Sequence, residues 1–210
     1  MNGVHMTAAK RAENRLISGL RTACVAFSLL LLGGAPALAD TATPAANEDT
    51  VQVDGQTLRL NGSGIHVINR VKIFTIGYYL PKLKTTQAEL LASPGPIRLK
   101  LVMLKSVEGD LMASRFLADI RTSTTKEERN QLLVQLMGMG QAFSEVGDWK
   151  VGHVMTIDWV HNKGVTFHEN GKQIGETLKD DLTMQAILRI WVGDNSNDPK
   201  LKRQLLGSKE

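Results

Sequence analysis

The chain has 210 residues, of which 42% are hydrophobic and 22% are charged, and 25 Lys and Arg against 21 Asp and Glu give a formal charge of +4. This composition is that of an ordinary globular protein, which excludes a disordered tail protein, a collagen-like repeat and a polytopic membrane protein. The one cysteine excludes an internal disulfide, and no Cys/His cluster has the spacing of a zinc or iron-sulfur site. We therefore expect one domain with a short extension and without a metal or other cofactor.

The first 39 residues have the three parts of a secretory signal peptide. Four basic residues precede an apolar run over residues 23–32, and Ala37-Leu38-Ala39 ends the segment with small residues typical of a cleavage site. The run is shorter than the roughly twenty residues that cross a bilayer, so we expect cleavage after Ala39 and a periplasmic protein, with an uncleaved anchor as the alternative. Removing the four basic residues and one acidic residue of this segment leaves 21 basic and 20 acidic residues. The mature chain is nearly neutral, and we expect no nucleic-acid partner.

A short leader precedes the folded domain. Residues 40–49 are small and polar, which predicts a flexible leader, and the domain is expected over residues 50–207. The domain opens with two short alternating strands around Asp54-Gly55, a dipeptide that favours a tight hairpin. Residues 61–64, Asn-Gly-Ser-Gly, predict a second turn. Residues 65–80 predict a long strand or a bent pair of strands.

The middle of the domain combines one strand with three helices. Capping boxes predict helices that begin after Thr86 and Thr125, and a further helix is expected from Asp110. Regular alternation over residues 97–105 predicts a half-buried strand. The helix after Thr125 is expected to end at a Gly-Met-Gly segment, residues 138–140. Its inward face is expected to comprise Leu132, Leu133, Leu136 and Met137, with Met139 as a further candidate.

The C-terminal third returns to strands and ends in helices. Residues 151–160 and 165–169 predict strands, and Asn170-Gly171 predicts the hairpin that leads to the next strand. One helix is expected from Asp180 to Gly193 and a short one from Asp198 to Gly207. This order of elements predicts an α+β domain with a mainly antiparallel sheet.

Motifs for several kinds of chemistry are missing from the sequence. No glycine-rich phosphate loop follows a strand, and no serine lies in a nucleophile elbow. His161 and His168 flank one predicted hairpin, but they lack the carboxylate spacing of a metal motif, which favours surface positions over a metal site.

The segments Leu60–His66, Lys72–Pro81 and Ala186–Gly193 have an order and spacing that resemble the chalcone isomerase-like family in its bacterial, secreted branch. The likeness spans about residues 51–207. It implies an open-faced β-sandwich, in which helices cover one face of an antiparallel sheet and a ligand cleft lies between the two. Enzymes of this family close a flavanone ring by intramolecular addition of a phenolate, whereas related non-catalytic members hold fatty acids with an arginine on the carboxylate.

The family's catalytic positions are changed in this chain. The arginine position falls on His66, and the strand threonine falls on Phe74, with Thr75 one residue away on the opposite face of the strand. Without donors aimed at the developing charge, the electrostatic part of catalysis is missing. The remaining hydroxyl and amide positions fall on or near Leu111, Ala118 and Ile190.

The resemblance and the lost positions together favour a non-catalytic periplasmic protein that binds a lipophilic, fatty-acid-like ligand between sheet and helices. The candidate contacts are His66, Lys72, Phe74, Thr75 and Tyr79. An acidic ligand would bind more tightly as the pH falls towards 6, because His66 then gains a charge. Two alternatives are an isomerase, or intramolecular lyase, with a rearranged site on His66, Thr75 and Tyr79, and a structural or partner-binding envelope protein. An ordinary strand histidine at position 66 is a further alternative, and the sequence does not indicate the oligomeric state.

Overall fold

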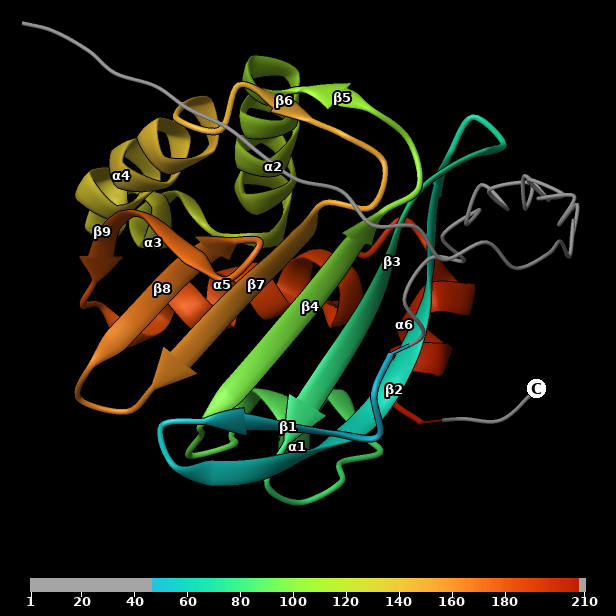
Figure 1. Cartoon of the computed structure of the whole chain (residues 1–210). Coiled ribbons are helices and arrows are strands. Elements are labelled where there is room, and N and C mark those ends of the chain that lie inside the picture. Colours follow the sequence, from blue (N-terminus) through green and yellow to red (C-terminus); the bar gives the residue numbers. More distant parts are fainter. Residues whose placement is uncertain (1–46, 208–210) are drawn as a thin grey trace, which may run out of the picture. The chain divides into compact units, whose positions relative to one another are not determined.

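The computed structural model describes residues 47–207, so the predicted signal peptide and most of the predicted leader lie outside the described residues. Seven antiparallel strands form one curled sheet in the order β1-β2-β3-β4-β7-β8-β9, and helices cover one of its faces (Figure 1), which confirms the expected α+β fold. The strands of this sheet are β1 (Thr50–Val53), β2 (Gln56–Ile68), β3 (Val71–Leu80), β4 (Ile97–Met103), β7 (Val154–Val160), β8 (Gly164–Glu169) and β9 (Lys172–Leu178). A second, two-stranded sheet pairs β5 (Val107–Glu108) with β6 (Asp148–Trp149). The helices are α1 (Gln87–Leu91), α2 (Gly109–Ser123), α3 (Lys126–Gln131), α4 (Leu133–Ser144), α5 (Asp181–Val192) and α6 (Pro199–Leu205).

Strand β2 runs through the segment where the sequence predicts a turn. The hairpin at Asp54-Gly55 is confirmed, but residues 61–64 continue the strand, with a bulge at Asn61 where the register shifts. The glycines there serve a contact between distant parts of the chain. A methyl group at Gly62 would lie 2.7 Å from the carbonyl oxygen of Leu205 and would overlap that of Gln204, because α6 lies directly on the strand. The prediction of a turn is therefore wrong.

Residues 65–80 form a bent pair of strands. The chain reverses between β2 and β3 at Asn69 and Arg70, which both have positive φ. A second bulge follows, because His66 pairs with Phe74 whereas the next pair is Val67 with Lys72. This register leaves Ile73 as an extra residue in β3.

Both capping boxes are present, and the helix after the second one is interrupted. Thr125 begins α3 as expected, but Leu132 separates α3 from α4, so the single predicted helix is two helices. Leu133 and Met137 are 59% and 69% exposed, so the prediction that they face inward is wrong. Each lies one position, or about 100°, beyond the buried stripe. That stripe comprises the buried Leu132, Met139 and Phe143 and the half-buried Leu136.

Gly138 and Gly140 lie within α4, so the prediction that they end the helix is wrong. A methyl group at Gly138 would lie 2.9 Å from Leu178 Cδ2 of β9. The glycine lets the helix approach the strand closely, a role that depends on a neighbour forty residues further along the chain.

The two C-terminal helices agree with the prediction, whereas the strand expected over residues 151–160 begins only at Val154. Asp180 caps α5 by accepting a hydrogen bond from Leu182 N at 2.9 Å, and Asp198 caps α6 by accepting one from Leu201 N at 2.9 Å. No helix within residues 47–207 is long and apolar enough to cross a membrane.

At the start of the described chain, Glu48 of the predicted leader forms an ion pair with Lys100 of β4 at 3.0 Å.

Candidate functional site

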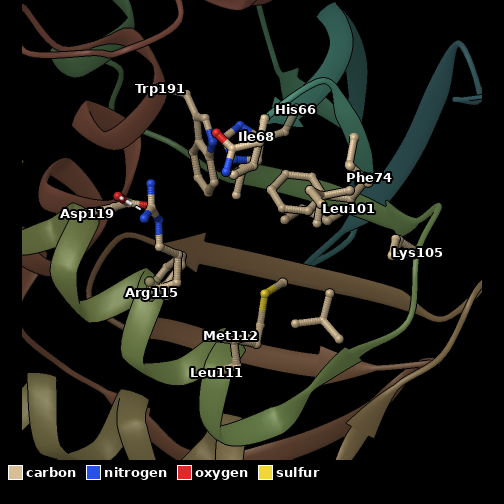
Figure 2. A pocket seen from close by; sticks show the side chains of 15 residues that line it. His66, Ile68, Phe74, Leu101, Lys105, Leu111, Met112, Arg115, Asp119 and Trp191 are labelled. Carbon is tan, nitrogen blue, oxygen red and sulfur yellow. Dashed lines mark ion pairs between the residues drawn. The ribbon is translucent and has the colours of Figure 1, made fainter.

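A cavity of about 390 Å³ lies between the sheet and helices α2 and α5. This volume falls in the range of small-molecule sites in proteins. Its wall is mainly apolar, and the polar groups gather towards its ends (Figure 2). The apolar lining comes from the sheet (Ile68, Val71, Ile73, Phe74, Leu101), from the segment before α2 (Val107), from α2 (Leu111, Met112, Phe116) and from α5 (Trp191).

The bulge in β3 shapes the sheet side of this cavity. In a regular strand consecutive side chains alternate between faces, yet the extra residue lets both Ile73 and Phe74 line the cavity. The Ile73 carbonyl oxygen accepts hydrogen bonds from Leu104 N at 2.8 Å and Lys105 N at 3.2 Å. These bonds hold Lys105 at the cavity edge.

Four rings form one end of the cavity. The His66 and Phe74 rings stack with centroids 4.8 Å apart and planes 19° apart. Trp191 meets Phe74 edge-on at 6.3 Å and lies 6.3 Å from Phe116. Such edge and offset contacts are the preferred geometries of aromatic pairs. This end of the cavity is therefore built from strands β2 and β3 together with both helices.

A guanidinium and a carboxylate lie beside these rings. Arg115 Nε is 3.6 Å from Asp119 Oδ1, one helical turn further along α2, and both side chains reach the cavity (Figure 2). Burial raises the pKa of the Asp119 carboxyl, and the Arg115 guanidinium opposes this shift. Burial also lowers the pKa of the His66 imidazole below its ordinary value of 6.5, with Asp198 opposing. His66 is thus neutral near pH 7. Its buried Nδ1 has no hydrogen-bond partner among the described residues.

The comparisons with known proteins agree with this fold. The model of the chalcone isomerase-like family matches residues 39–207. The chain belongs to the chalcone isomerase-like family. Its fold is similar to the crystal structure of a fatty-acid binding protein from Arabidopsis thaliana, with a TM-score of 0.55 and 12% sequence identity over 75% of this chain and 95% of that chain. No curated protein sequence matches the chain.

This chalcone isomerase-like chain brings two of the five residues expected at the site to the cavity. His66 and Phe74 line it, whereas Lys72, Thr75 and Tyr79 do not. Thr75 follows Phe74 and takes the other face of β3, and Tyr79 packs with a small apolar cluster on that outer face. Burial raises the pKa of the Tyr79 hydroxyl to about 12. Lys72 lies opposite Val67, next to the bulge, and is exposed.

Arg115, Trp191 and Lys105 are among the lining residues that were not expected at the site from the sequence. Arg115 restores a cation to the cavity of this chalcone isomerase-like domain, but from α2 rather than from β2. Matching this sequence to the family position by position cannot find Arg115, because the positive charge lies on α2 and not at the expected position on β2. The one local signal is its spacing of four from both Leu111 and Asp119, which places an ion pair at the edge of an apolar helix face.

The histidines of the β7–β8 hairpin do not form a metal site. His168 lies opposite Thr156 in the sheet, whereas His161 lies beyond the end of β7. Within residues 47–207, no group of three or more His, Cys, Asp and Glu side chains is arranged to hold a metal ion.

Proposed function

We propose that this protein binds one fatty-acid-like molecule, with its chain in the cavity between the sheet and helices α2 and α5, and does not catalyse a reaction on it. The observation that carries the proposal is an apolar cavity of about 390 Å³ with polar groups gathered towards its ends. A long apolar chain with a polar end matches that distribution. The shared fold with a plant fatty-acid binding protein supports the same class of ligand.

The cavity volume suggests a chain length. A methylene takes up about as much space as a water molecule, roughly 30 Å³, so the cavity matches about a dozen carbons. Each buried methylene contributes about 0.8 kcal/mol. Four methylenes contribute about 3 kcal/mol, so affinity should rise about two hundredfold from an eight-carbon to a twelve-carbon acid and level off soon after. This plateau tests whether the chain occupies the cavity or only a surface.

The geometry disfavours the isomerase alternative. That alternative needs His66, Thr75 and Tyr79 around one substrate, but only His66 lines the cavity, and the other two lie on the outer face of the sheet. A general base must come within hydrogen-bond reach of the proton that it removes. Residues on opposite faces of a sheet do not meet this condition for one substrate.

The proposal is tested by filling the cavity. Leu111 lines it and is 59% exposed, so Leu111→Trp adds bulk without emptying the core. Leu133 on α4 is also 59% exposed but does not line the cavity, which makes Leu133→Trp the matched control. Calorimetric titration with dodecanoate should give at least tenfold weaker binding for the first variant and unchanged binding for the second. Equal binding by both variants, or no lipid in native mass spectra and no thermal shift with fatty acids, would overturn the proposal.

We further propose that the protein acts in the periplasm as a member of the bacterial, secreted branch of its family. The basic and apolar segments of residues 1–39 support this location. Fractionation of the source cells should recover the protein in the periplasmic fraction, with Asp40 as its first residue. A full-length chain in the cytoplasm would contradict the proposal.

A further inference from the structure

A second hollow of about 260 Å³ adjoins the apolar cavity at its aromatic end. The two lie next to each other, because they share six lining residues: His66, Ile68, Asn69, Arg115, Asp119 and Trp191. The residues that only the second hollow contains include Ser196, Asn197 and Asp198, from the segment between α5 and α6. A ligand whose chain fills the first space thus has room in the second for a polar group larger than a carboxylate.

Negative charge predominates in this second hollow. Of its described lining residues, Asp119 and Asp198 are acidic, and Arg115 is the one that carries a permanent positive charge. Asp119 already lies 3.6 Å from the Arg115 guanidinium. Burial keeps His66 neutral near pH 7, so it adds no positive charge there. A bare carboxylate placed here would meet two carboxylates against one guanidinium, whose Nε lies 3.6 Å from one of them.

We infer that the natural ligand is an acyl-chain or alkyl-chain amphiphile whose head group carries an amine, and that Asp119 and Asp198 select it over a free fatty acid. An ammonium group has three donors, which suits two carboxylates and the unpartnered ring nitrogen of His66. The inference rests on the proposed function, because it assigns the polar end of the ligand whose chain occupies the cavity.

The test compares ligands that differ only in their head groups. Dodecylammonium and dodecanoate are titrated calorimetrically into the full-length mature protein at pH 7.5. We expect dodecylammonium to bind about tenfold more tightly, which corresponds to about 1.4 kcal/mol. The double variant Asp119→Asn/Asp198→Asn should bring this ratio to about one or below. Asparagine also caps helices well, so α6 keeps its start.

Two further variants make the result specific. Asp110→Asn removes a carboxylate from the same helix outside both hollows, and it should leave the ratio unchanged. Dodecanoate could also bind the other way round with its carboxylate beside Lys105, so Lys105→Gln confines the comparison to the second hollow. Equal or tighter binding of dodecanoate in both the wild type and Lys105→Gln would overturn the inference while leaving the proposed function intact. If neither ligand binds, both fail.

Discussion

Gly62→Ala tests whether the packing of α6 on strand β2 requires a residue without a side chain at position 62. The new methyl group would lie 2.7 Å from Leu205 O and closer still to Gln204 O, and both are main-chain atoms of α6 and its end. They cannot turn aside as a side chain does, so the helix must move by several tenths of an ångström or more. Overpacking of this kind costs about 1–3 kcal/mol.

The upper limit of the cost comes from the packing of α6 itself. If the helix left the sheet, Leu201 and Leu205, now 1% and 0% exposed, would become accessible at about 2 kcal/mol each. We therefore expect Gly62→Ala to lower the free energy of unfolding by about 3 kcal/mol. With a urea dependence of about 2 kcal/mol per molar, the midpoint would fall by about 1.5 M.

The matched control is Gly140→Ala in α4. Its methyl group would lie 3.4 Å from Leu117 Cδ1, the end of a flexible side chain, so the helix should gain about 0.5–1 kcal/mol from the better helix former. The reasoning about Gly62 would be refuted if its alanine variant unfolded within about 0.5 kcal/mol of the wild type. Gly62→Ala should also reduce the preference for dodecylammonium over dodecanoate, because α6 carries Asp198 at its start.

Three further results are expected. Asn61→Ala should cost about 2–3 kcal/mol, because the buried amide donates to Leu205 O at 2.8 Å and its loss leaves that carbonyl unpaired; an unchanged urea midpoint would contradict this. Burial acts to raise the pKa of the Glu128 carboxyl, but its hydrogen bonds and its pairing with Arg189 lower this pKa overall. Glu128→Gln should therefore reduce the free energy of unfolding by about 1 kcal/mol at pH 7, and by less as the pH falls below about 4.5. Because burial lowers the pKa of His66 in the folded state, the unfolded chain binds the proton first, and stability should fall between pH 7 and 5; His66→Gln should flatten this slope in denaturation curves, and an equal slope would count against buried neutral His66.

Local signals predicted the elements that depend on neighbouring residues. Asp54-Gly55 and Asn170-Gly171 take the positive φ values that tight hairpins need, and both hairpins are present. The capping box at Thr125 begins a helix because its two hydrogen bonds join residues three apart. Such contacts join residues only a few positions apart, so they can be predicted from the sequence alone.

Contacts between distant segments were not predictable in this way. The Asn-Gly-Ser-Gly run of residues 61–64 has the composition of a turn, yet its glycines accommodate α6, about 140 residues later. Arg115 was missed for a related reason, since the family comparison sought a cation on β2 and this chain supplies one from α2. In both cases the role of the residue depends on which distant segment packs against it in the fold.

The two bulges lie where the sheet meets the elements that carry charged lining residues. At the first bulge, the side-chain amide of Asn61 donates a hydrogen bond to Leu205 O at the C-terminal end of α6. Asp198, at the N-terminal end of the same helix, lines the second hollow. The bulge at Ile73 widens the apolar wall and holds Lys105 at the cavity edge. Because each bulge contacts an element that carries a charged lining residue, we expect one inserted or deleted residue in β2 or β3 to alter the proposed head-group preference while the sheet order remains the same.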